Sequence, residues 1–130
     1  MTVRVVRLGT ARARGEGLRL GTVRRPPRGV PKAEFARRNY YDIWLPELAP
    51  SASLASWGLS VPWTSARWRR FQRAYLREMG RPHTRHLITL LAALSHRTNF
   101  SVGCYCVDST RCHRTLLREL LVDAGAKVPK

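Results

Sequence analysis

The order of the apolar segments along the chain limits its fold more than any other feature. Short runs rich in β-branched and aliphatic residues predict strands at residues 3–8, 18–23 and 100–106. Three helical segments separate the second strand from the third, and a helix over residues 112–124 follows the third. Strands that are joined through helices pack as parallel neighbours. The sequence therefore predicts one small α/β domain over residues 1–130, with a mainly parallel sheet flanked by helices.

The clearest helix is predicted over residues 65–79, where large apolar side chains recur at spacings of three and four. These side chains are Trp68, Phe71, Tyr75 and Met79. We interpret this aromatic face as part of the core rather than as a platform for stacking nucleic-acid bases. Gly80 and Pro82 end the helix, and another helix is expected over residues 84–96.

Positive charge dominates the composition. The chain carries 24 Lys and Arg against 8 Asp and Glu, a net charge of +16. This charge favours anionic partners, either a small anionic ligand or nucleic acid. The arginines are spread along the chain without a helix-turn-helix, zinc-finger or aromatic RNA-binding signature, so nucleic acid is expected to bind without sequence readout. Asp42 and Glu47 are expected to pair with the surplus arginines, although both could instead face the cysteine-rich segment as acid or base.

The sequence predicts a cytoplasmic protein. Prolines interrupt the longest uncharged stretch, residues 48–66, and arginines interrupt the N-terminal apolar run, so we expect neither a membrane span nor a signal peptide. The three cysteines are an odd number gathered late in the chain, which is a poor disulfide framework. A reducing compartment is therefore expected.

Residues 103–114 hold all three cysteines and span the predicted junction between the last strand and the last helix. Cys106 ends the strand, and Cys112 with His113 begins the helix. Ligands bind at the carboxyl ends of strands in open α/β sheets, and the free amides of a helix start attract anions. The predicted ligand-binding residues are two arginines and two helix-capping residues of this segment, with one arginine of the basic, proline-rich loop at residues 24–31: Arg111, Arg114, Ser109, Thr110 and Arg28.

Three interpretations of this segment stay open. In the first, Cys106 or Cys112 is a reactive thiolate with His113 and Asp108 as further catalytic residues, because a helix start and nearby arginines lower the pKa of a thiol. In the second, Cys106, Cys112 and His113 hold a transition metal, zinc or iron, and a fourth ligand comes from Cys104, His83, His86 or His96. The third is structural, because buried cysteines pack as small hydrophobes, and we prefer it for Cys104 in mid-strand.

Four parts of the chain together carry a resemblance to a known family. They are residues 41–51, Trp57, the aromatic face of residues 65–79, and residues 106–114. They look like the bacterial domain of unknown function 488 family, in its YeaO-like branch, over nearly the whole chain. The resemblance implies a cytosolic α/β domain and supplies no activity. Where relatives carry an aspartate-arginine-leucine-tryptophan-proline-arginine-glycine stretch, residues 27–30 are what survives here.

We therefore predict an α/β protein with an anion-binding site at the last strand–helix junction, where Cys106 or Cys112 reacts or binds a metal. The alternative is a basic protein without catalysis that associates with nucleic acid. The residue pattern leaves the substrate and the oligomeric state open.

Overall fold

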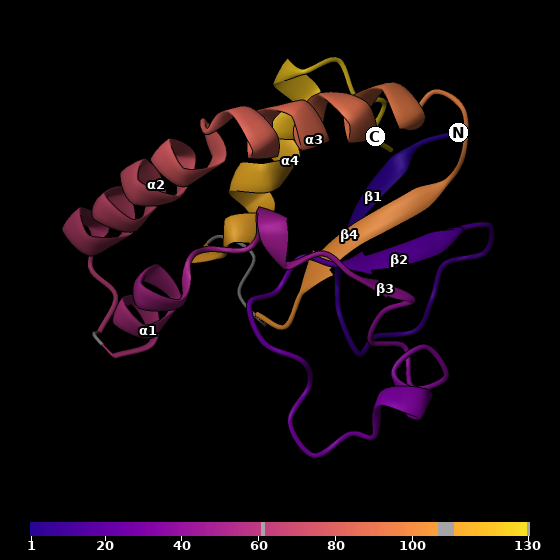
Figure 1. The fold of residues 1–130 in the computed structure, drawn as a ribbon, viewed down its shortest axis with the longest axis horizontal. Coiled ribbons are helices and arrows are strands. Elements are labelled where there is room, and N and C mark those ends of the chain that lie inside the picture. The colour runs from indigo at the N-terminus through magenta and orange to yellow at the C-terminus, as the bar shows by residue number, and fades with distance from the viewer. Residues whose placement is uncertain (61, 107–110, 130) are drawn as a thin grey trace.

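A four-stranded, all-parallel sheet forms the centre of the molecule (Figure 1). The computed structural model describes residues 1–60, 62–106 and 111–129. The sheet order is β1-β4-β2-β3, with strands β1 (Val3–Arg7), β2 (Leu18–Gly21), β3 (Ile43–Trp44) and β4 (Phe100–Cys104). The predicted α/β domain with a mainly parallel sheet is confirmed. The two-residue strand β3 at one edge was not predicted, because two exposed residues leave no pattern to detect.

The helices pack over the sheet and enclose the main core. They are α1 (Ala52–Ser60), α2 (Ser65–Met79), α3 (Pro82–Leu94) and α4 (His113–Asp123), with 3-10 turns at η1 (Lys32–Glu34) and η2 (Pro46–Leu48). Aliphatic residues of the strands, such as Val3 and Val102, pack against buried side chains of α2, α3 and α4. In Figure 1 the segment between β2 and β3 extends away from these helices. None of the helices described is long and apolar enough to cross a membrane.

Helix α2 has the predicted bounds, and its aromatic face is core as expected. Phe71 and Tyr75 are buried, and Trp68 stacks on Phe71 with ring centroids 5.7 Å apart. The helix begins after Thr64, whose side-chain oxygen accepts a hydrogen bond from the Arg67 N–H. Helix α3 begins at Pro82 rather than two residues later, because the fixed φ of proline suits the first turn of a helix.

Strand β4 lies in the middle of the sheet, and all five of its residues are buried. Its Gly103 pairs with Val6 of β1 on one side and Gly21 of β2 on the other. A Cβ atom at Gly103 would lie 2.6 Å from the Val6 carbonyl oxygen, so only glycine permits this close approach. The strand therefore delivers Cys104 to a fixed point at the carboxyl edge of the sheet.

A buried ion pair joins β2 and β4 to the loop after β1. Arg19 is fully buried and donates from Nε and Nη2 to the Glu16 carboxylate, at 2.8 and 3.0 Å. Its Nη1 donates to the carbonyl oxygens of Thr10 and Asn39, both at 2.8 Å. Ser101 of β4 donates to the same carboxylate at 2.7 Å. The Arg19 guanidinium is thus held by four acceptors inside the fold.

Asp42 pairs with arginine, as the sequence analysis expected. Its carboxylate accepts from the Arg12 guanidinium at 2.8 Å and from the Arg19 backbone N–H at 2.7 Å. Burial alone would raise the pKa of Asp42, but these hydrogen bonds outweigh it and hold the pKa below its usual range. Asp42 therefore fastens the segment before β3 to β2.

Candidate functional site

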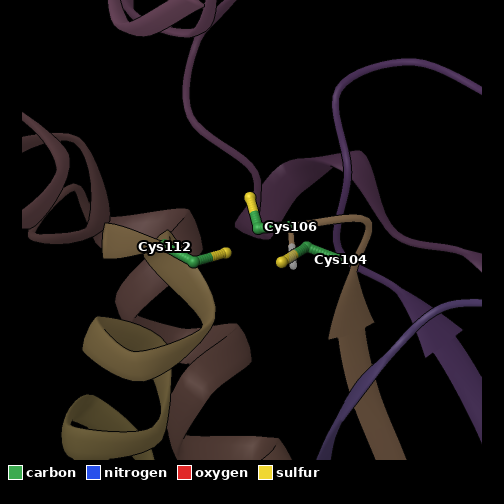
Figure 2. A group of neighbouring side chains, drawn as sticks. All are labelled: Cys104, Cys106 and Cys112. Atoms are coloured by element: carbon green, nitrogen blue, oxygen red, sulfur yellow. The ribbon is translucent and has the colours of Figure 1, made fainter. Parts of the chain in front are cut away.

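The three cysteines converge where β4 ends and α4 begins. Their Sγ atoms all lie within 4.8 Å of one another (Figure 2). Cys104 is the last residue of β4, Cys106 follows two residues later, and Cys112 is the N-cap of α4. In Figure 2 the side chains of Cys104 and Cys112 point toward one another from the strand and from the helix. Cys104 and Cys112 are buried, whereas Cys106 is exposed.

Cys104 is the residue for which the sequence analysis preferred a packing role. It does pack in a small apolar cluster with Leu8, Val23 and Tyr41. Its sulfur also belongs to the thiol cluster, however. The one-residue spacing between Cys104 and Cys106 was a usable signal, because residues two apart on extended chain project to the same side.

Hydrogen bonds within the cluster separate the three thiols in acidity. The thiols of Cys104 and Cys112 donate to the Cys106 sulfur and lower the pKa of Cys106 well below that of an ordinary thiol, and the charge of Arg114 adds to this effect. The same hydrogen bonds, together with burial, raise the pKa of Cys104 and Cys112. The negative charge of the cluster at neutral pH therefore resides on Cys106, its exposed member.

His113 lies beside the thiols in the first turn of α4. Its Nε2 is 2.6 Å from the Thr22 carbonyl oxygen, and its Nδ1 is 3.9 Å from the Cys112 sulfur. A carbonyl oxygen only accepts, so Nε2 carries the proton and Nδ1 is the unprotonated ring nitrogen that faces the Cys112 sulfur. Burial lowers the pKa of His113, which keeps the imidazole neutral. His113 thus lies next to Cys112 outside the group of possible metal ligands, which among the described residues consists of the three cysteine sulfurs.

A pocket of about 510 Å³ opens beside the cluster. Its walls are largely apolar and aromatic and include Trp63 and Phe71, with further residues of α1. The three cysteines and His113 also line it, as do three arginines: Arg24, Arg25 and Arg111. Most small-molecule sites combine an apolar wall with a few polar groups in this way.

The arginines of the pocket differ in what they already bind. Arg24 donates to the carbonyl oxygens of Pro50 and Pro46, at 2.9 and 3.1 Å, so it ties the basic loop to the segment before α1. Arg25 and Arg111 are exposed. The sequence analysis did not select Arg24 and Arg25, because the pattern of residues 24–31 predicts a basic, proline-rich loop without showing which of its arginines lie near the cysteines.

The remaining predicted ligand residues are placed as follows. Arg28 is exposed on the same basic loop, next to Gly29 with its positive φ of 73°. Arg114 is buried and lines a second cavity rather than the thiol pocket. Asp108, Ser109 and Thr110 lie outside the described residues.

Comparisons with known proteins give one match. The family model described as the active DUF488-N3 subclade matches residues 3–125. No curated protein and no solved structure matches the chain. The match covers β1 through α4 and includes the complete thiol cluster, while the YeaO-like branch stays a prediction.

Proposed function

This chain belongs to the DUF488 family, and on that premise we propose that it is a thiol-dependent enzyme in which Cys106 is the nucleophile. The observation that carries the proposal is the position of Cys106. Its sulfur is the exposed member of a cluster whose other two thiols are buried donors. A thiolate sulfur that lines a pocket is the arrangement that nucleophilic cysteines need.

The pocket supports a substrate that combines an anionic group with an apolar part. Arg25 and Arg111 are exposed and line the pocket, so their guanidinium groups are free to approach an anion. Trp63 and Phe71 offer ring faces and edges to the apolar part. The sequence-based candidates Arg28, Ser109 and Thr110 stay proposed as further contacts to the anion.

The proposed chemistry is covalent. The Cys106 thiolate forms a bond to an electrophilic atom of the substrate, and the bond to the leaving group breaks. The leaving group departs with the bonding electrons and takes the proton of the Cys112 thiol, so that the negative charge passes to Cys112. His113 is a positioning residue in this proposal, because its Nε2 donates to the Thr22 carbonyl oxygen and its ring lies against the Cys112 sulfur. Asp108 stays proposed as a further acid or base.

A metal centre is the second candidate, and the convergence of three sulfur atoms favours it. A tetrahedral zinc ion with Zn–S bonds of about 2.3 Å needs ligand sulfurs about 3.8 Å apart. The three Sγ atoms already lie within 4.8 Å of one another, so small side-chain rotations would suffice. Three sulfurs leave a fourth position open toward the pocket, as in catalytic sites. Zinc or iron would bind through Cys104, Cys106 and Cys112, and His113 would support Cys112.

Alkylation by iodoacetamide as a function of pH tests the thiolate directly. We expect Cys106 to react at pH 6 about as fast as at pH 8, whereas an ordinary thiol slows about tenfold for each unit of pH below its pKa. Cys106→Ser should remove the fast reaction. Cys112→Ser is the matched control, because it keeps a donor beside Cys106 and should keep the fast reaction. A rate that rises tenfold per pH unit up to pH 8 would contradict the proposal.

Elemental analysis of protein purified without chelators separates the two candidates. Metal-free protein with the fast alkylation supports the nucleophile. Near-stoichiometric zinc or iron, lost in both Cys104→Ser and Cys112→Ser, would replace the thiolate with a metal centre. The nucleic-acid alternative stays a prediction, and it requires DNA or RNA affinity that falls steeply with salt. A cytoplasmic location is proposed for either function.

A further inference from the structure

Arg114 is a buried cation with a free donor. It lies in the first turn of α4, and its side chain is 7% exposed. Its Nη1 has no hydrogen-bond partner in the structure as described. A buried guanidinium N–H that bonds nothing costs the full desolvation of that group. Such a group is uncommon in folded proteins, and a water, ion or ligand from outside the chain is one way to complete it.

The cavity that Arg114 lines is distinct from the thiol pocket. It has a volume of about 540 Å³ and lies between β1, the loop after β1, α4 and the C-terminal segment. The thiol pocket lies at the carboxyl edge of β4, and its walls come from α1, α2 and the segment after β2. The two cavities are therefore separate sites on one domain.

Positive charge exceeds negative charge among the described residues that line this second cavity. Three further arginines line it: Arg4, Arg7 and Arg118. Glu16 is the only acidic residue among the described lining residues, and Arg19 already binds both of its carboxylate oxygens. Burial would raise the pKa of Glu16, but hydrogen bonds from Arg19, Ser101 and the Ala13 N–H outweigh it and lower the pKa to about 2. The carboxylate therefore stays charged toward Arg19, and none of the other described lining residues offers the four arginines a carboxylate.

We propose that this second cavity binds the phosphate group of a small phosphorylated organic molecule, with the buried Arg114 as one of its cations. Arginine is suited to phosphate, because its planar fork presents parallel donors to two oxygens. A phosphate dianion also matches several guanidinium groups better than a single carboxylate does. The volume exceeds what one inorganic ion needs and falls in the usual range of small-molecule sites. Val5, Val128 and Pro129 supply an apolar wall for the organic part.

Isothermal titration calorimetry with three probes tests the class of ligand. The probes are inorganic pyrophosphate, AMP and adenosine, titrated into the full chain at low ionic strength. We expect pyrophosphate and AMP to bind and adenosine to fail, because adenosine lacks the phosphate. Absence of pyrophosphate and AMP binding at millimolar concentration would overturn the proposal, and so would equal binding of adenosine.

Variants locate the site. Arg114→Met should weaken AMP binding about tenfold or more, the loss expected for one charge-assisted hydrogen bond. Arg4→Gln, at a partly exposed position, tests the same cavity if Arg114→Met does not fold, and it should weaken binding several-fold. Arg85→Gln, exposed on α3, is the matched control for the general attraction of a basic protein and should leave binding unchanged. The proposal would be overturned if Arg85→Gln weakened AMP binding as much as the cavity variants do. It would also be overturned if AMP binding were unchanged in both Arg114→Met and Arg4→Gln.

A Cys106→Ser variant distinguishes failure of the phosphate-site proposal from failure of the proposed thiol enzyme. It should lose the fast alkylation and still bind AMP. Loss of AMP binding in Cys106→Ser would place the anion in the thiol pocket and overturn a second site.

Discussion

Two arginines are buried in this domain, and they differ in what surrounds them. Arg19 is fully buried on β2, and its guanidinium donates to the Glu16 carboxylate and to two backbone carbonyls. Arg114 is nearly as buried at the start of α4, yet its Nη1 bonds nothing in the part of the chain described. Both side chains end in the same guanidinium group, but Arg19 has all of its acceptors inside the fold and Arg114, among the described residues, does not.

The completeness of hydrogen bonding therefore distinguishes a structural buried cation from one that is available to a ligand. Removing a guanidinium from water is costly, and only complete pairing repays that cost. The fold itself repays it for Arg19, since acceptors from three parts of the chain converge there. For Arg114 the hydrogen bonds of the fold offset only part of the desolvation cost, and a bound ligand could offset the rest. Composition cannot make this distinction in a chain so rich in arginine.

The largest effect is expected from Arg19→Met. This substitution leaves Glu16 buried without its partner, and breaking a buried pair in this way costs about 3–5 kcal/mol of unfolding free energy. Urea denaturation followed by circular dichroism measures the loss. Arg37→Met is the matched control, because Arg37 pairs with Glu34 on the surface and should cost less than about 1 kcal/mol. Similar losses in the two variants would remove the distinction.

The contribution of the Glu16–Arg19 pair to stability should depend on pH, because Glu16 loses its charge in acid. Its pKa is about 2 in the fold against 4.5 for the unperturbed group. A lowered pKa stabilises the protein above pH 4.5, and this contribution disappears as the pH falls from 4.5 toward 2. The difference in melting temperature between wild type and Glu16→Gln should therefore be largest at pH 6 and shrink toward pH 2. A difference that stays constant across this range would show that the charge of Glu16 contributes nothing.

The smallest effect is expected from Arg114→Met. Replacing an incompletely paired buried cation with an apolar side chain of similar length removes a desolvation cost. The unfolding free energy of the ligand-free protein should therefore change by less than about 1 kcal/mol, or increase. Urea denaturation of this variant beside Arg19→Met compares the two positions under one condition. A loss as large as that of Arg19→Met would make Arg114 a structural residue like its counterpart.

Secondary structure was largely predictable, because it rests on local patterns. The bounds of α2 follow from a face repeated every three or four residues, and the strands follow from short β-branched runs. The start of α3 was placed two residues late, since Pro82 was interpreted as a terminator of α2 rather than the first residue of α3. The short strand β3 depends on pairing with β2 and has no pattern of its own.

The candidate site was predicted in part. Cys106, Cys112 and His113 were identified from one segment at a strand–helix junction, and the structure brings them together. For Cys104 the sequence favoured packing, because a buried strand cysteine has the same local pattern whether or not other thiols lie beside it, and its spacing from Cys106 was the one signal of a shared site. The walls of the pocket come from α1 and α2, about 35 to 50 residues away in the chain.

The sequence by itself determined the fold class, the order of the helices and of every strand except β3, and the one segment with reactive residues. Those properties depend on periodicity and on neighbours in the chain, which a sequence records directly. Tertiary structure alone decided that three thiols share one site, that Arg114 faces a second cavity and that Arg19 is fully paired. Each of these depends on groups far apart in the chain that meet at distances of a few ångströms. Burial and hydrogen bonding then set the charge of each group, and neither exists before the chain has folded.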